Sequence, residues 1–266
     1  MNVPTVQPRT IYFLTLFRHN RGIIDGLKIN ANYTVSNYII EVDNYGNQSG
    51  HVYCTGIAYE NHAGARIENC EVTINAYLNS GRGEFGGICS FNEGKIANCL
   101  VKGSITSTAG ISGVSSGGIA YVNGLYYPSD AEITGCTNRA SISGYSNIGG
   151  IATQNDGKIS SCLNEGTLTL NYEDNIAFGA IGGIAGSNGY NYGVVSSITL
   201  CRNTGIIRFG YYPPSFYVFH PVMGIIIGRN YGGSTGSNIL GGSMDLSNLP
   251  ERCRQYAGYR EIGREM

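Results

Sequence analysis

The stretch from Gly149 to Leu168, GGIATQNDGKISSCLNEGTL, decides the fold. It holds a glycine pair, three short apolar steps and two Asn-x-Gly corners, which start at Asn155 and Asn164. Asparagine and glycine favour tight corners, whereas the apolar steps favour extended backbone. Three short strands divided by corners make one turn of a coil, and most of the chain repeats this turn imperfectly.

Copies of the turn follow one another at intervals of 31 to 42 residues, measured between the apolar residues four positions before the first corner asparagine. These anchor residues are Leu16, Ile57, Ile88, Ile119, Ile151, Ile184 and Ile226. A period of about 20 to 50 residues is typical of solenoids, in which each unit buries its apolar face against its neighbours. The sequence therefore predicts an all-β solenoid of about seven coils with three short strands per coil, forming one domain over residues 1–247.

Residues that recur once per coil are expected to form columns. The first corner asparagines are Asn20, Asn61, Asn92, Asn123, Asn155, Asn188 and Asn230, and a shorter second set is Asn138, Asn164 and Asn203. We expect each amide to hydrogen-bond its equivalent in the next coil and the corner backbone to be left-handed. The glycine pairs, such as Gly149 and Gly150, mark a corner that needs positive φ or close backbone approach.

Five of the eight cysteines also recur at one position of the repeat: Cys70, Cys99, Cys136, Cys162 and Cys201. This spacing predicts an inward column of buried thiols that behave as small hydrophobic side chains. Metal binding by cysteine needs clustered ligands with CxxC-like spacing, which the chain lacks. We therefore expect no metal site, and since no phosphate-binding loop precedes a helix, no cofactor.

Several segments depart from the repeat. A long excursion is expected at residues 30–55, and inserts rich in aromatic residues at 124–132, 189–197 and 209–221. The first two inserts leave the same corner two coils apart, so their tyrosines are expected on one side of the rod. Residues 248–266 are predicted to form a C-terminal cap or tail, because Pro250 and Glu251 are typical of a helix start.

Composition limits the partners. Charged residues make up only 13% of the chain and the net charge is −1, which argues against nucleic acid as a partner. The longest apolar run near the start, residues 11–17, is far shorter than the roughly 20 residues of a membrane span, so we expect no membrane insertion.

Tyrosines in the inserts are the main candidates for ligand binding. The chain has 20 tyrosines and no tryptophan, and tyrosine rings suit stacking on sugars or contact with a protein. The candidates are Tyr126, Tyr127, Tyr190, Tyr192, Tyr211, Tyr212 and Tyr217. The alternative is that these inserts fold down and bury their own rings on the rod.

A catalytic site is the alternative reading. Glu93 and Asp156 lie in the middle of corners two coils apart, a separation of about 10 Å that would suit an inverting glycosidase. Lys95 and Lys158 follow these corners and would either bind an acidic sugar or pair with the acids. Acidic residues are also common in turns for conformational reasons, and no Ser-His-Asp arrangement occurs.

The segments GGIATQNDGKISSC and GGICSFNEGKIANC resemble the GLUG-motif repeat family, and the resemblance covers about residues 16 to 240. It implies a right-handed parallel β-helix in a bacterial secreted or surface-attached protein, where such repeats usually belong to adhesins or proteases. We therefore expect a non-enzymatic, adhesin-like module at the cell surface or outside the cell that binds a glycan or a surface protein, or acts as a spacer. The alternatives are a polysaccharide lyase or glycoside hydrolase on the same fold, and a subunit that self-associates through its coil ends into a fibre.

Overall fold

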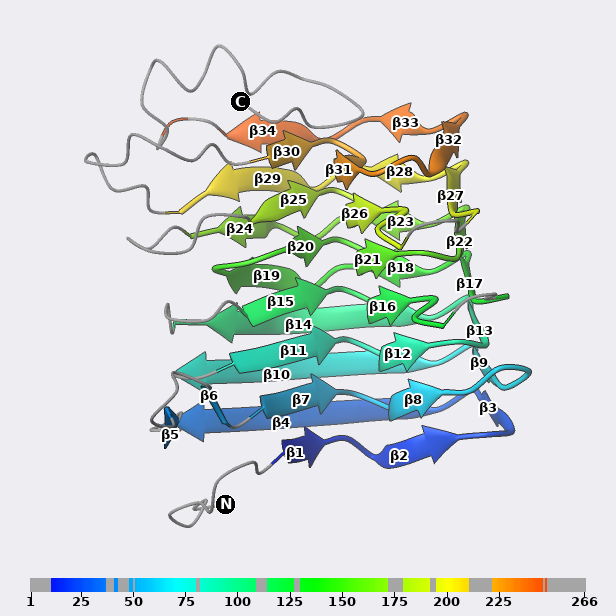
Figure 1. Ribbon diagram of the computed structural model, residues 1–266, viewed down its shortest axis with the longest axis vertical. Coiled ribbons are helices and arrows are strands. Elements are labelled where there is room, and N and C mark those ends of the chain that lie inside the picture. The colour runs from blue at the N-terminus through cyan, green and yellow to red at the C-terminus, as the bar shows by residue number, and fades with distance from the viewer. Residues whose placement is uncertain are drawn as a thin grey trace.

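The computed structural model describes residues 11–36, 41–42, 48–49, 51–79, 82–108, 114–126, 130–171, 179–191, 195–210, 222–245 and 247. These residues form an all-β solenoid whose parallel strands stack coil upon coil, which confirms the predicted fold (Figure 1). The chain crosses the near side of Figure 1 from left to right and returns on the far side as it climbs, so the coil is right-handed. Within the described residues no helix is long and apolar enough to span a membrane.

Each coil contributes to four sheets, here named A to D, rather than to the three predicted. Sheets A, B and C each contain seven strands, which confirms seven coils. Sheet A consists of β1 (Ile11–Leu14), β7 (His51–Thr55), β11 (Arg82–Gly86), β15 (Val114–Gly117), β20 (Ile148–Gly149), β25 (Ala180–Gly182) and β30 (Val222–Gly224). Sheet B consists of β2 (Phe17–Asn20), β8 (Ala58–Asn61), β12 (Cys89–Asn92), β16 (Ala120–Asn123), β21 (Ala152–Asn155), β26 (Ala185–Asn188) and β31 (Ile227–Asn230).

Sheets C and D complete the coil. Sheet C consists of β3 (Ile23–Asp25), β9 (Arg66–Glu68), β13 (Lys95–Ala97), β17 (Glu132–Thr134), β22 (Lys158–Ser160), β27 (Ser197–Thr199) and β32 (Ser234–Gly236). Sheet D has one long strand in each of the first three coils and two short strands in each later coil. These are β4 (Lys28–Ser36), β10 (Glu71–Asn79), β14 (Leu100–Ser107), β18 (Thr137–Asn138), β19 (Ser141–Gly144), β23 (Leu163–Asn164), β24 (Leu168–Leu170), β28 (Arg202–Asn203), β29 (Ile206–Phe209), β33 (Ile239–Leu240) and β34 (Ser243–Asp245).

The glycine pair marks the division between sheets A and B in the third to sixth coils, and the remaining coils divide at the same place without it. A Cβ atom on Gly149 would lie 1.7 Å from the carbonyl oxygen of Ala152, and one on Gly150 would lie 2.1 Å from that of Gly183 in the next coil. Close backbone approach is therefore what requires glycine here. Positive φ, the other predicted reason, does not apply to these glycines.

In the fourth to sixth coils a second corner in sheet D coincides with an asparagine in place of valine, whereas in the last coil sheet D divides at Leu240. Val101 of β14 lies opposite Asn138 of β18, and the long strand of sheet D breaks at Asn138. The Asn138 side chain turns inward, where its amide group donates to the carbonyl oxygen of Ala140 at 3.3 Å and its oxygen accepts from the Ala140 N–H at 3.0 Å. These bonds stabilise the corner at Asn138, and a valine side chain has no polar group to form them.

Isoleucines fill the interior. The predicted anchor positions share one register, and from Ile57 to Ile226 each is fully buried, whereas Leu16 in the terminal coil is 52% exposed. Burial of each isoleucine contributes about 1.5–3 kcal/mol. From Ile57 to Ile184 the backbone N–H of each anchor bonds to the carbonyl oxygen of the next, as between Ile88 and Ile119 at 2.8 Å.

The asparagine column is a continuous ladder of amide hydrogen bonds. The Nδ2 of each corner asparagine from Asn20 to Asn188 donates to the Oδ1 of its equivalent in the next coil, at 2.7 to 3.1 Å. The prediction of a ladder is confirmed, but the prediction of left-handed backbone at these asparagines is wrong. At this corner the left-handed residue is in some coils the following glycine, as at Gly124 and Gly189. A second left-handed position, present in every coil, is the residue just before the cysteine column, occupied by Gly26, Asn69, Asn98, Gly135, Ser161, Leu200 and Ser237 with φ between 53° and 68°.

The five cysteines of the column are buried, as predicted, and none of them forms a disulfide bond. The backbone N–H of Cys99 donates to the Sγ of Cys136 at 3.5 Å. Hydrogen bonding to the Cys136 thiol is the largest cause that raises the pKa of Cys99, to about 12. In the last coil Asn238 takes the position of the cysteine, and its side-chain oxygen accepts from the Cys201 N–H at 2.9 Å.

The departures from the repeat are shorter than predicted. The first residues of the expected excursion at 30–55 belong to β4 and the last five to β7, and within the described residues it also holds the antiparallel pair β5 (Glu41–Val42) and β6 (Gln48–Ser49). Of the insert predicted at 209–221, Phe209 ends β29 and is buried. Its other members apart from Gly210, and the predicted cap at 248–266, lie outside the described residues.

Candidate functional site

Glu93, a candidate catalytic acid, holds a loop. It follows the corner asparagine of β12, and its Oε1 accepts hydrogen bonds from the backbone N–H groups of Leu125 and Tyr126. Leu125 and Tyr126 begin the insert of the next coil. The carboxylate therefore satisfies backbone donors that would otherwise need another partner.

Asp156 likewise holds an insert, the one predicted at residues 189–197. A catalytic carboxylate must face its substrate, but Asp156 is only 1% exposed. Its two oxygens accept from the backbone N–H of Asn191 at 3.2 Å, from the Asn191 side-chain amide at 2.8 Å and from Gln154 Nε2 at 2.5 Å. Both acids of the predicted catalytic pair are thus engaged in fixing the inserts.

The two lysines lie on sheet C, away from these acids. Lys95 and Lys158 occupy one register on either side of Glu132. Lys95 forms an ion pair with Glu132 at 3.3 Å, and Lys158 is exposed. The predicted alternative that the lysines pair with Glu93 and Asp156 is therefore wrong for Lys95.

Two of the predicted ligand-binding tyrosines are described, and both are exposed. Tyr126 is 64% and Tyr190 55% exposed, in inserts that leave the same corner column. Tyr190 packs edge-on against Tyr231, with ring centroids 5.2 Å apart. The other predicted tyrosines, Tyr127, Tyr192, Tyr211, Tyr212 and Tyr217, lie outside the described residues.

Five aromatic rings meet where sheets A and B adjoin, a feature that the sequence analysis did not single out. We call them the ring cluster: Phe13, Tyr53, Tyr59, Phe91 and Tyr121. Each ring is partly exposed. The centroids of neighbouring rings lie 4.4 to 5.8 Å apart, in stacked, tilted and edge-to-face pairs. The cluster thus spans the first four coils on the outer side of sheets A and B, which we call the front face.

Glu84 of β11 lies within this cluster and hydrogen-bonds Tyr53 and Tyr121. Burial is the largest cause that raises the pKa of both tyrosines well above the ordinary value, and the Glu84 charge adds to it. Burial, with a smaller contribution from the nearby Glu60 charge, also raises the pKa of Tyr59 to about 12. The three hydroxyls are protonated at neutral pH, and those of Tyr53 and Tyr121 bond to Glu84.

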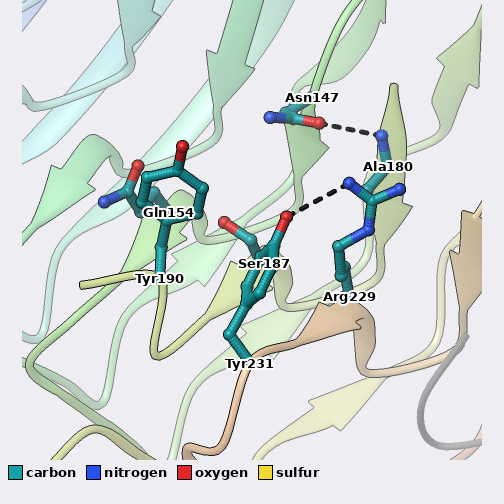
Figure 2. A pocket seen from close by; sticks show the side chains of 7 residues that line it. All are labelled: Asn147, Gln154, Ala180, Ser187, Tyr190, Arg229 and Tyr231. Carbon is teal, nitrogen blue, oxygen red and sulfur yellow. Dashed lines mark hydrogen bonds between the residues drawn. The ribbon is translucent and has the colours of Figure 1, made fainter. Parts of the chain in front are cut away.

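A pocket of about 190 Å³ continues the front face in the later coils (Figure 2). Its rim is formed by Tyr190, Tyr231 and Arg229, and Arg229 NH1 donates to the Tyr231 hydroxyl at 3.1 Å. Its other lining residues are Asn147, Gln154, Ala180 and Ser187. The lining is mainly polar side chains with two tyrosine rings, a combination that suits a hydroxyl-rich ligand.

The strand register of sheet B connects the ring cluster with the pocket. In sheet B a single outward column runs from His19 and Glu60 through Phe91, Val122, Gln154 and Ser187 to Arg229. Of these positions Phe91 belongs to the ring cluster, and Gln154, Ser187 and Arg229 line the pocket. The cluster and the pocket therefore share one column of sheet B, with Val122 between them.

The chain was compared with family models, curated proteins and solved structures, and none of the three comparisons gave a match.

Proposed function

We propose that this chain is a non-enzymatic β-helix module that binds an extended glycan along its front face. The observation that carries this proposal is the ring cluster, five partly exposed rings that lie in line with a polar pocket. Flat rings stack on the apolar faces of sugars, while hydroxyl, amide and guanidinium groups bind sugar hydroxyls. The secreted or surface setting implied by the GLUG-motif resemblance agrees with such a ligand.

The placement of the acids supports binding rather than cleavage. Glycoside hydrolysis needs two carboxylates that face a substrate. Glu93 and Asp156 instead accept hydrogen bonds from insert residues, and Glu84 bonds to two tyrosines. These three acids therefore stabilise the fold, and the front face keeps its groups for binding.

A glycan array probed with the full chain, alongside a reducing-end assay on the same polysaccharides, tests the proposal. We expect binding to a defined class of oligosaccharide with no release of reducing ends. Release of new sugar ends would contradict the non-enzymatic assignment. Absence of binding to any glycan would contradict the ligand class.

Self-association through the coil ends is a second candidate function. In the first coil Leu16, Phe17 and Ile23 are 52%, 44% and 67% exposed, and in the last coil Ile239 is 54% exposed. Exposed apolar residues on unpaired strand edges favour pairing with another chain. Sedimentation velocity over a range of concentrations should show growing linear oligomers, and a monomer at all concentrations would exclude this function.

A further inference from the structure

Three side chains converge at the outer surface of the first two coils. His19 Nδ1 lies 2.8 Å from Glu60 Oε2, His62 Nε2 lies 3.3 Å from the same oxygen, and the two nitrogens are 3.2 Å apart. Register explains the convergence, because His19 of β2 lies directly opposite Glu60 of β8. His62 follows β8 by one residue, at the corner where its backbone N–H bonds to Asn20.

The triangle of ligand atoms has the size of one face of a metal coordination sphere. Zn²⁺ binds imidazole nitrogen and carboxylate oxygen at about 2.0–2.2 Å, which separates neighbouring ligand atoms by about 3.3 Å in a tetrahedron. The three measured separations of 2.8, 3.3 and 3.2 Å are close to that value. Each residue therefore needs to move by only a few tenths of an ångström to hold an ion.

The chemistry of the ligand set selects the class of ion. Two imidazoles and one carboxylate suit first-row transition metals, whereas Ca²⁺ and Mg²⁺ prefer oxygen ligands. Binding requires the free lone pair at Nδ1 of His19 and at Nε2 of His62, with the proton on the other nitrogen of each ring. The side chains of all three residues are partly exposed, at 41%, 25% and 33% for His19, Glu60 and His62, so the fourth position opens to solvent.

Neighbouring charged groups do not complete the site. Glu93 lies at the same corner as His62 in the next coil, but its Oε1 bonds to the backbone of Leu125 and Tyr126. Glu68, on sheet C, forms an ion pair with Arg66 at 2.5 Å. Among the described residues the protein ligands are thus three, with water as the remaining ligand, the arrangement of open zinc sites.

We propose that His19, Glu60 and His62 bind one Zn²⁺ ion that links the first coil to the second. The sequence analysis predicted no metal site because it looked for closely spaced ligands, and here the two histidines are far apart in the chain. The link matters because the first coil has a neighbour on one side only and exposes Phe17 and Ile23. An ion bound only by the folded chain stabilises it by mass action.

Calorimetric titration of Zn²⁺ into the chelator-treated full chain tests the proposal. We expect one ion per chain and a rise in thermal midpoint on addition of Zn²⁺. The variants His19→Gln and His62→Gln should each weaken binding at least about tenfold, since even partners of metal ligands have effects of that size. The controls His51→Gln and Glu68→Gln should bind as the wild type does.

Co²⁺ distinguishes this site from the cysteines. Co²⁺ held by two imidazoles and a carboxylate should give visible d–d bands without the near-ultraviolet band of cobalt thiolate. The proposal is overturned by binding that survives in the His19→Gln/His62→Gln double variant, by a thiolate band, or by no binding up to about 1 mM Zn²⁺. A hydrogen-bonded group of three side chains with no affinity for metal would give the last result.

Discussion

Substitution of Asn123, in the middle of the asparagine ladder, should destabilise the coil strongly. The Asn123 side chain is fully buried, and its Nδ2 donates to Asn155 Oδ1 at 2.7 Å and to the Lys158 carbonyl oxygen at 3.2 Å. Its Oδ1 accepts from Asn92 Nδ2 at 2.8 Å. Each bond contributes about 0.5–1.5 kcal/mol, so Asn123→Ala should lower the free energy of unfolding by about 2–4 kcal/mol.

Urea unfolding followed by far-ultraviolet circular dichroism measures this loss. The matched control is Asn75→Ala, which removes an exposed side-chain bond to Asn32 Oδ1 of 3.0 Å on sheet D. That exposed bond should contribute less than about 0.5 kcal/mol, because water replaces it. If Asn123→Ala costs no more than Asn75→Ala, the ladder does not hold the coils together in the way argued here.

Three further predictions concern the backbone, the inserts and the tyrosines. Leu200→Asn should raise the free energy of unfolding by about 0.5–1 kcal/mol, because leucine is strained at its φ of 55° and asparagine occupies the equivalent position at Asn98; urea unfolding that shows no gain would contradict this. Asp156→Ala removes the acceptor for Asn191 and should make the insert at 189–197 more sensitive to limited proteolysis, with unchanged cleavage counting against the assigned role. Burial raises the pKa of Tyr59 from 10.0 to about 12, so its contribution to stability is complete below pH 10 and is lost as the pH rises towards 12; the urea midpoint should fall less steeply over this range in Tyr59→Phe, and equal slopes would refute the link.

The fold could be predicted from the repeat because each residue that recurs once per coil contacts its equivalent in the next coil. Asn155 and Cys162 face their own equivalents in neighbouring coils, so a position in the repeat also gives a position in space. The left-handed position before the cysteine was not predicted, because its residue type differs between coils, for example glycine at Gly26 and leucine at Leu200. The sequence therefore gives no recurring residue that would mark it. The fourth sheet was missed because the first side of each coil was taken as one strand, whereas it divides into two even where the glycine pair is absent, as at Thr15 and Leu16.

The candidate site was predictable only in part, because its residues differ from coil to coil. Tyr126 and Tyr190 were found as departures from the repeat, and of the two outcomes left open for their rings, exposure or burial on the rod, the structure shows exposure. The ring cluster was missed because Tyr59 and Phe91 lie inside regular strands, where an outward aromatic residue gives no signal by itself. Listing the outward positions by register would have placed Phe91 next to Glu60 and revealed the column.

Calorimetric titration of an oligosaccharide identified on the array tests the front-face proposal most directly. Phe91→Leu keeps an apolar side chain but removes the flat ring, and it should weaken binding roughly fivefold to tenfold, the effect of about 1 kcal/mol of stacking. Tyr77→Leu is the control, because Tyr77 is an exposed tyrosine on sheet D, outside the front face, and its loss should leave affinity unchanged. Equal affinity of the wild type and Phe91→Leu, or an equal loss in Tyr77→Leu, would contradict the proposal that the ring cluster binds the glycan.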